Sequence, residues 1–327
     1  LNLSKFYIKK RRVNTIFKRI KSIEENYSRS LDYKKVFSII LKNKINYLDV
    51  GAREGPDKKL DIYKKYFSTI LCEPENSEVK KLKKKGYIVI NKIISDKSGL
   101  KKFYITKDPM KSSTLETGGS MEKYFCKDEG LEKCKIKRKV KINSITLDQI
   151  EKKLKIKIHY LKLDTQGSEF KILNSMKNSC PVFIKTEVSV GELYKKQGLL
   201  YDIGKLLYEK GYIMFRNNIL NRNVPFSKNF AKMNIPPSLG LPLHGDVYFM
   251  PDWTRKIGRK IIKDNELEWI AIMLFEGQQQ LLMYINSIIK LKVEDRDQVA
   301  LVSLDSRSRS FDSTIELTIK KSKFKIK

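Results

Sequence analysis

The chain has 327 residues, of which 41% are hydrophobic, so it can bury a substantial core and is not disordered throughout. Its 68 lysines and arginines against 37 acidic residues give a net charge of +31, which favours anionic partners. Four cysteines without a Cys-x-x-Cys spacing and only two histidines argue against a zinc site. The sequence shows neither a membrane-spanning apolar run nor a signal sequence, so the expected location is the cytoplasm.

Residues 1–44 combine lysine and arginine with apolar residues at helical spacings, such as Val13, Ile16, Phe17 and Ile20. This pattern predicts one or two basic amphipathic helices. Two roles are open for them: the apolar stripe caps the core domain, or the helices attach to an anionic membrane at the inner face of the membrane. We prefer capping, because it also accounts for the stripe.

A buried strand is predicted over residues 46–50, and it ends in a turn that contains Gly51 and Gly55. Both glycines can adopt positive φ and allow a ligand to approach the backbone closely. A dinucleotide site requires the spacing Gly-x-Gly-x-x-Gly, which is absent here. The turn, followed by a segment able to form a helix, therefore favours a nucleoside without a phosphate group.

The next two predicted strands also end in polar residues. The strand at 69–72 leads into Glu73 and Pro74, at the distance along the chain where a carboxylate commonly binds ribose hydroxyls. A helix at 76–85, ended by Gly86, leads to a single strand predicted at 87–94. This strand ends at Ser95 and Asp96, and Asp96 either accepts from an adenine amino group or only starts a turn.

Residues 102–169 contain both weakly and strongly predicted secondary structure. A short strand is predicted at 102–105, a polar loop at 111–115, and a charged, irregular excursion at 116–139 that could act as a lid. Thr146 is a predicted N-cap, and the strand at 158–163 then delivers Asp164 to its carboxyl end. Gly167 turns the chain into a helix near Glu169.

Further strands are predicted at 181–188, which carries Glu187, at 212–215 and at 243–250, which begins beside His244. A helix at 201–210 precedes the second of these, and a Pro/Asn-rich loop separates the last two. This order predicts an α/β domain over residues 45–252, with a mostly parallel, doubly wound sheet and an antiparallel edge strand. Residues 253–327 form a C-terminal extension with a long helical pattern and two short strands, suited to packing or self-association.

Four motifs in this order resemble the FkbM family of S-adenosylmethionine-dependent methyltransferases, which have the class I Rossmann-like fold. The resemblance covers residues 46–250 and leaves both flanks outside. Gln166 stands where the family usually has glutamate, which puts in doubt any role that needs a charge there. The matching motifs are Asp49-Val50-Gly51-Ala52, Glu73-Pro74, Ser95-Asp96-Lys97-Ser98-Gly99 and Lys162-Leu163-Asp164-Thr165-Gln166-Gly167-Ser168-Glu169.

The resemblance implies that the cofactor is S-adenosyl-L-methionine and that its methyl group passes to an oxygen nucleophile. The expected acceptor is a hydroxyl of a small molecule, sugar, glycan or glycolipid, and such a hydroxyl benefits from a general base. His244 is the first candidate for the base, and Asp164 and Glu187 compete with it. The spacing requires no metal. The expected cofactor-binding residues are Asp49, Gly51, Ala52, Gly55, Glu73, Pro74, Ser95, Asp96 and Asp164.

Two alternatives remain open at this stage. A nucleic-acid methyltransferase would suit the net charge of +31, although the chain has no RNA-binding signature with interleaved aromatics and no base-flipping motif. A non-catalytic protein of the same fold could bind membranes or polyanions. The intact set of Asp49, Gly51, Glu73 and Asp96 argues against the loss of a cofactor site.

Overall fold

The computed structural model describes residues 34, 37–38, 41–120, 122, 128–222, 241–289, 298–301 and 317–320. The chain divides into two compact units, Asn43–Ile272 and a second unit made of Leu1–Lys42 and Met273–Lys327. Most of the predicted N-terminal helices and of the loop between the last two strands of the sheet lie outside the described residues. None of the described helices is long and apolar enough to cross a membrane.

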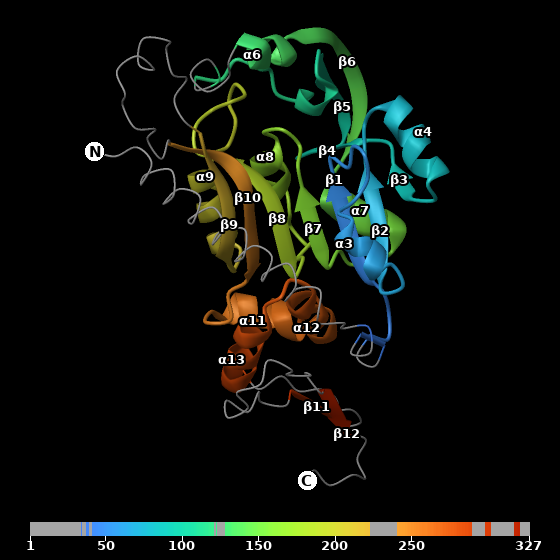
Figure 1. Ribbon diagram of the computed structural model, residues 1–327, viewed down its shortest axis with the longest axis vertical. Helices are drawn as coiled ribbons and strands as arrows, with labels where there is room; N and C mark the ends of the chain where they lie inside the picture. The colour runs from blue at the N-terminus through green and yellow to red at the C-terminus, as the bar shows by residue number, and fades with distance from the viewer. Residues whose placement is uncertain are drawn as a thin grey trace, which may run out of the picture. The chain divides into compact units, whose positions relative to one another are not determined.

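A seven-stranded sheet forms the centre of the larger unit (Figure 1), in the order β3-β2-β1-β7-β8-β10-β9. Its strands are β1 (Ile45–Val50), β2 (Phe67–Cys72), β3 (Ile88–Ile90), β7 (Tyr160–Leu163), β8 (Phe183–Ser189), β9 (Tyr212–Arg222) and β10 (Leu241–Pro251). Neighbours from β3 to β8 are parallel, whereas β10 runs antiparallel to both β8 and β9. The predicted α/β fold, with antiparallel pairing at one edge of a mostly parallel sheet, is confirmed.

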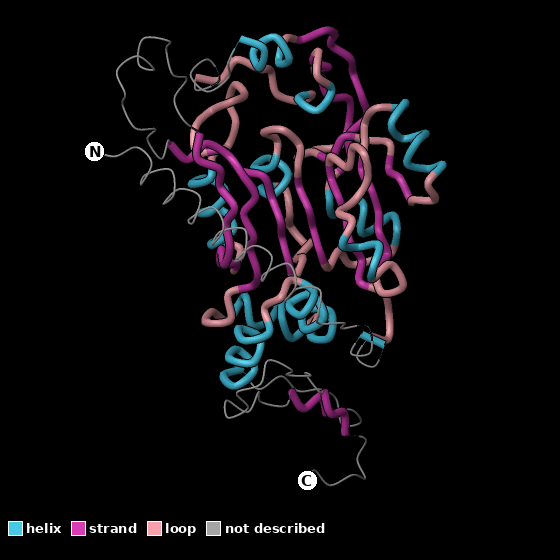
Figure 2. Tube along the Cα trace, viewed as in Figure 1, coloured by secondary structure: helices cyan, strands magenta, loops and turns pink. Residues whose placement is uncertain are grey.

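Helices follow β1, β2, β7 and β8 along the chain, and Figure 2 shows helices (cyan) beside the strands of the sheet (magenta). The helix α7 begins as its sequence predicts, because Thr146 accepts from the backbone N–H of Gln149 while the Gln149 side chain accepts from that of Thr146. The helical pattern after residue 253 is divided among α11, α12 and α13. The helices are α3 (Lys59–Ile62), α4 (Asn76–Lys84), α6 (Asp128–Cys134), α7 (Leu147–Leu154), α8 (Glu169–Asn174), α9 (Leu200–Glu209), α11 (Lys256–Lys263), α12 (Glu266–Phe275) and α13 (Gln279–Ile289).

A second sheet of three strands, β4 (Ile93–Ile94), β6 (Ile136–Ile145) and β5 (Gly99–Thr106), stands beyond the carboxyl ends of β1, β2 and β7 (Figure 1). The prediction of one continuous strand at 87–94 is therefore wrong. The chain leaves the large sheet at Asn91, whose side chain donates to the carbonyl oxygens of Glu73 and Pro74. This contact ties the break to the end of β2.

The prediction of an irregular excursion at 116–139 is also wrong from residue 128 onward, because α6 spans Asp128–Cys134 and is followed by β6, which begins at Ile136 and pairs with β5 along its length. Apolar residues alternate there with lysines, but the density of lysine hides the alternation in the sequence. The strand predicted at 102–105 extends over all of β5. In the smaller unit, β11 (Gln298–Leu301) and β12 (Leu317–Lys320) form an antiparallel pair.

Aromatic side chains run across one face of the large sheet and set the register of its central strands. The rings of Tyr47 and Tyr160 lie 4.7 Å apart, and those of Tyr160 and Phe183 lie 4.6 Å apart. These residues are cross-strand partners in β1, β7 and β8. Because such pairs stabilise one register, the carboxyl ends of the strands come to the same edge of the sheet.

Candidate functional site

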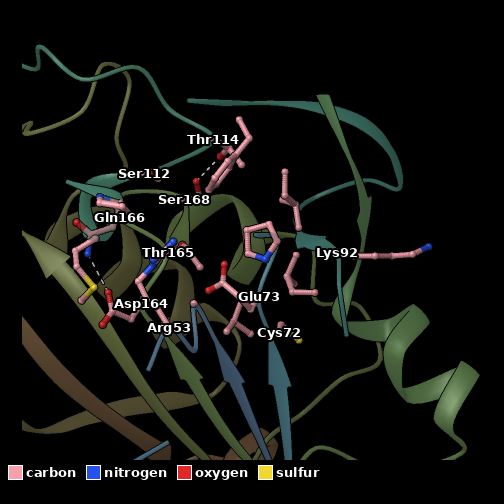
Figure 3. Close-up of a pocket in the computed structure, with 18 of the residues that line it drawn as sticks. Arg53, Cys72, Glu73, Lys92, Ser112, Thr114, Asp164, Thr165, Gln166 and Ser168 are labelled. Atoms are coloured by element: carbon pink, nitrogen blue, oxygen red, sulfur yellow. Dashed lines mark hydrogen bonds between the residues drawn. The ribbon is translucent and has the colours of Figure 1, made fainter. Parts of the chain in front are cut away.

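A pocket opens at this edge, between the carboxyl ends of β1, β2 and β7 and the small sheet (Figure 3). Open α/β sheets bind their ligands at this edge. The small sheet adds apolar surface through Ile93, Ile94 and Phe103, for which the sequence offered no signal. The remaining lining residues are Val50, Gly51, Arg53, Cys72, Glu73, Pro74, Lys92, Pro109, Met110, Lys111, Ser112, Thr114, Lys162, Asp164, Thr165, Gln166 and Ser168.

Asp49, the first residue of the first motif, lies beneath the pocket and does not line it. Its carboxylate is completely buried and accepts from Lys162 Nζ, with distances of 3.1 Å to Oδ1 and 3.3 Å to Oδ2. Burial raises the pKa of Asp49, and the Lys162 ammonium opposes this change. Asp49 thereby holds the lysine of the neighbouring strand, which does reach the pocket wall.

Gly51 follows β1 with φ of +84°, and a Cβ atom there would lie 1.8 Å from the carbonyl oxygen of Asp164. Only glycine therefore lets the end of β1 approach the end of β7 this closely. The sequence predicted a close approach to a ligand, whereas the nearest group is the protein's own backbone. Ala52 is instead buried against Leu71 and Leu82, and Gly55 adopts φ of +107° outside the pocket lining.

Glu73 and Pro74 line the pocket at the end of β2, as Figure 3 shows for the carboxylate of Glu73. Glu73 is almost fully buried, and its Oε1 accepts from the backbone N–H of Glu75 at 2.9 Å. Burial raises the pKa of Glu73, while the hydrogen bond and the nearby Arg53 guanidinium oppose the change. Arg53 itself forms an ion pair with Glu75.

Ser95 and Asp96, the third motif, lie next to the pocket but outside its lining. The Ser95 hydroxyl donates to Asp96 Oδ1 at 2.9 Å, and Lys101 Nζ lies 2.8 Å from the same oxygen. The hydrogen bond from Lys101 holds the pKa of Asp96 below its usual range. Asp96 thus orders the turn between β4 and β5, and the two isoleucines before it supply the pocket wall.

Asp164 lines the pocket at the end of β7 and is joined to Gln166 and Glu187 by hydrogen bonds. Gln166 Nε2 donates to Asp164 Oδ1 and to Glu187 Oε2, both at 3.0 Å. Gln166 Oε1 accepts from the Tyr194 hydroxyl, also at 3.0 Å. A glutamate at position 166 has no such donor when ionised, so the amide is suited to bridge two carboxylates.

The turn that carries Gln166 is held from below by Glu169, the first residue of α8. Glu169 Oε1 accepts from the backbone N–H and the hydroxyl of Thr165, and Oε2 accepts from the backbone N–H of Gly167. Gln166 has φ of +57°, a left-handed conformation that non-glycine residues adopt rarely. Burial and the neighbouring Glu187 raise the pKa of Glu169 to about 7.

The three candidate bases are not equivalent in position. Asp164 lines the pocket, and burial followed by the charge of Glu187 raises its pKa to about 6. Glu187 and His244 lie outside the lining, with His244 Nδ1 at 3.4 Å from Glu187 Oε1. His244, the first candidate from the sequence, is therefore separated from Asp164 by Glu187 and Gln166.

The described residues contain no group of three or more His, Cys, Asp or Glu side chains placed to hold a metal ion. Asp164 and Glu187 meet through the neutral amide of Gln166, and His244 contacts only the second of them. Hydrogen bonds thus link Asp164 in the pocket wall to Glu187, which lies outside the lining, and His244 is within 3.4 Å of Glu187. The sequence motifs brought the residues to one edge but did not show how Gln166 connects them.

No curated protein matches the chain. Among solved structures, it is similar to magnesium protoporphyrin IX methyltransferase (ChlM) from Synechocystis PCC 6803 with bound SAM, with 8% identity over 71% of this chain and 83% of that one. The TM-score is 0.33. The model of the methyltransferase FkbM domain matches residues 49–214, half of the chain, which therefore belongs to the FkbM methyltransferase family.

Proposed function

We propose that the protein uses S-adenosyl-L-methionine to methylate a hydroxyl of a sugar, glycan or glycolipid. The observation that carries the proposal is Asp164, a carboxylate in the pocket wall whose pKa is raised to about 6. A base with a pKa near the working pH is ionised at neutral pH and still accepts a proton effectively. Membership of a methyltransferase family supports the choice of methyl transfer.

The pocket residues fit the cofactor at two places. Glu73 uses Oε1 to hold the turn at Glu75, while Oε2 has no hydrogen bond to a described residue and can accept from ribose hydroxyls. Ile93, Ile94 and Phe103 provide an apolar wall suited to a purine ring. The same set suits a nucleoside better than a phosphate, because no glycine-rich phosphate loop follows β1.

The bound cofactor would supply a methyl group already activated by its sulfonium, so the protein's task is to align the acceptor and to receive its proton. Asp164 Oδ1 is fixed by Gln166, and Oδ2 has no hydrogen bond to a described residue. We assign Oδ2 as the atom that takes the proton from the acceptor hydroxyl. Glu187 lies behind Gln166 and makes Asp164 more basic through its charge.

Transfer of a labelled methyl group tests this proposal directly. The purified chain is incubated with methyl-labelled S-adenosyl-L-methionine and, in separate reactions, with oligosaccharides, glycolipids and RNA. We expect the label in a glycan or glycolipid as an alkali-stable methyl ether, and its loss in the Asp164→Asn variant. Label in RNA alone would contradict the acceptor, and calorimetry that detects no cofactor binding would contradict methyl transfer itself.

A further inference from the structure

The small sheet has two chemically different faces. Side chains alternate between the faces of a strand, so residues of β5 and β6 divide into two sets. One set packs against Ile93 through Phe103, Ile105, Val140 and Ile142, and it also includes Lys101, opposite Ile142, and Arg138, opposite Ile105. Phe103 from this set also lines the pocket. The other set, which we call the outer ribbon face, consists of Leu100, Lys102, Tyr104, Lys139, Lys141 and Asn143.

The outer ribbon face concentrates positive charge in a way that costs stability. Lys102 lies directly opposite Lys141 in the antiparallel register, and Lys139 lies opposite Tyr104 in the adjacent pair on that face. Like charges directly opposite each other destabilise a sheet. Neither Lys102 nor Lys141 forms an ion pair with a described residue, whereas Lys139 lies 3.6 Å from Glu116, which also pairs with Lys195.

Folding alone does not account for this arrangement, because one acidic residue in place of either lysine would turn the repulsion into attraction. An anionic partner would account for it, since the partner would neutralise lysines that the protein leaves unpaired. The exposed apolar residue on the same face narrows the kind of partner. Leu100, opposite Asn143, leaves 65% of its surface exposed beside the lysines. Basic and apolar side chains on one surface are typical of contact with an anionic membrane.

We propose that the outer ribbon face binds the surface of a membrane that contains anionic phospholipid. Lysine is a flexible point charge, suited to diffuse attraction to headgroups, whereas nucleic-acid recognition favours arginine and exposed aromatic rings. The face has one aromatic residue, Tyr104, and Lys139 Nζ lies over its ring at 5.4 Å. Nucleic acid is therefore the less suitable partner. The inference is independent of the methyl acceptor, because no residue of the outer ribbon face lines the pocket.

Vesicle binding by the full chain tests the proposal, with phosphatidylcholine vesicles compared with vesicles that also contain phosphatidylglycerol. The test variant is Lys102→Glu/Lys141→Glu. The matched control is Lys64→Glu/Lys65→Glu, which makes the same charge change at exposed residues before β2, at the opposite edge of the large sheet. Each lysine near an anionic surface contributes roughly fivefold in affinity, so we expect the test variant to bind at least about 25-fold more weakly.

The control variant is expected to retain most of its vesicle affinity and its cofactor affinity. Equal losses in the two variants, or no loss in either, would overturn the proposal by showing that net charge or another segment carries the binding. Wild-type chain that binds RNA but not anionic vesicles would also overturn it and favour nucleic acid. Cofactor affinity measured in parallel separates this result from a failure of the proposed methyl transfer.

The single variant Lys102→Glu tests whether weaker vesicle binding could result from a destabilised fold. It replaces a repulsive cross-strand pair with an attractive one, so the melting temperature should stay the same or rise. Vesicle affinity should nevertheless fall by at least about fivefold. A variant that melts higher and binds vesicles as well as the wild type would show that the lysines are only solvated surface.

Discussion

Two carboxylates, the buried Glu73 and the half-buried Asp164, line the same pocket, and their surroundings differ. Glu73, after β2, accepts from a backbone N–H and lies near the guanidinium of Arg53. Asp164, after β7, accepts from the neutral amide of Gln166 and faces a second carboxylate, Glu187. Burial raises the pKa of both. The next strongest influence is a backbone hydrogen bond that lowers the pKa at Glu73, whereas at Asp164 it is the charge of Glu187, which raises the pKa further.

This difference indicates a division of labour within one pocket. A carboxylate held by a backbone donor beside a cation is suited to accept hydrogen bonds without changing its charge. A carboxylate that shares a neutral amide with another carboxylate is suited to exchange a proton near neutral pH. We therefore expect changes at Glu73 to affect cofactor affinity and changes at Asp164 to affect the rate of transfer.

The largest effect is expected from Asp164→Asn. The amide keeps the shape of the side chain but cannot accept a proton from the acceptor, so kcat should fall by about 10² to 10⁴-fold. The dissociation constant of S-adenosyl-L-methionine, measured by calorimetry, should change by less than about threefold. The reason is that Glu73, and not Asp164, is proposed to bind the ribose of the cofactor. A variant with wild-type kcat would remove Asp164 from the role of base.

Glu73→Ala should give the opposite pattern. Loss of a hydrogen bond from a charged group costs about 1.5–3 kcal/mol, so the cofactor dissociation constant should rise by at least about tenfold. At saturating cofactor, kcat should recover most of its wild-type value. Glu73→Gln retains an acceptor oxygen and is expected to lose less affinity than the alanine variant. An unchanged dissociation constant in Glu73→Ala would contradict the ribose assignment.

The strand ends that carry these two carboxylates were readable from the sequence because apolar runs stop there at charged residues. Glu73 and Asp164 each follow such a run, and parallel strands bring their ends to one edge. Asp96 followed the same rule and yet lies outside the pocket, because its strand leaves the large sheet at Asn91. That departure depends on tertiary contacts with Glu73 and Pro74, which a local pattern does not contain.

The bridge that Gln166 forms between Asp164 and Glu187 could not be predicted from the sequence either. Its bridging amide depends on a left-handed turn fixed by Glu169 and on the position of Glu187 in another strand. The wall contributed by Ile93 and Ile94 was hidden for a related reason, because the sequence places them at the end of one strand over 87–94 and does not show that the chain leaves the large sheet at Asn91. The assignments of individual cofactor-binding residues stay predictions.

Gln166→Glu tests the difference between Asp164 and Glu73, because it adds a charge beside Asp164 and not beside Glu73. The change removes the donor shared by Asp164 and Glu187 and places a third carboxylate beside them, so the pKa of Asp164 should rise above about 6. Because the base must be ionised, the acid limb of the kcat profile should move to higher pH by at least about one unit. Among the other charges near Asp164, Lys162 lowers its pKa and Asp246 raises it.

A leucine at position 166 is the control for Gln166→Glu, because it removes the hydrogen bonds without adding charge. Its acid limb should move by less than that of the glutamate variant, although kcat should fall as Asp164 loses its orientation. If both variants have the wild-type profile, the group that titrates in the profile is not Asp164.

The smallest effect is expected from His244→Gln, even though His244 is one of only two histidines in the chain. His244 contacts Glu187 at 3.4 Å and lies outside the pocket lining, so it acts on Asp164 only through Glu187 and Gln166. We expect kcat to fall by less than about fivefold. The pH profile alone would not identify the base, because histidine side chains ordinarily titrate in the same region as the pKa of about 6 at Asp164.

The variant separates the two groups, because the remaining histidine, His159, accepts from the backbone N–H of Asn46 near the start of β1, at the opposite edge of the sheet. If Asp164 is the base, the acid limb near pH 6 persists in His244→Gln. If His244 is the base, that limb disappears and kcat falls by about 10²-fold or more. The second result would place the proton transfer outside the pocket lining, and Glu73 and Asp164 would then both serve binding.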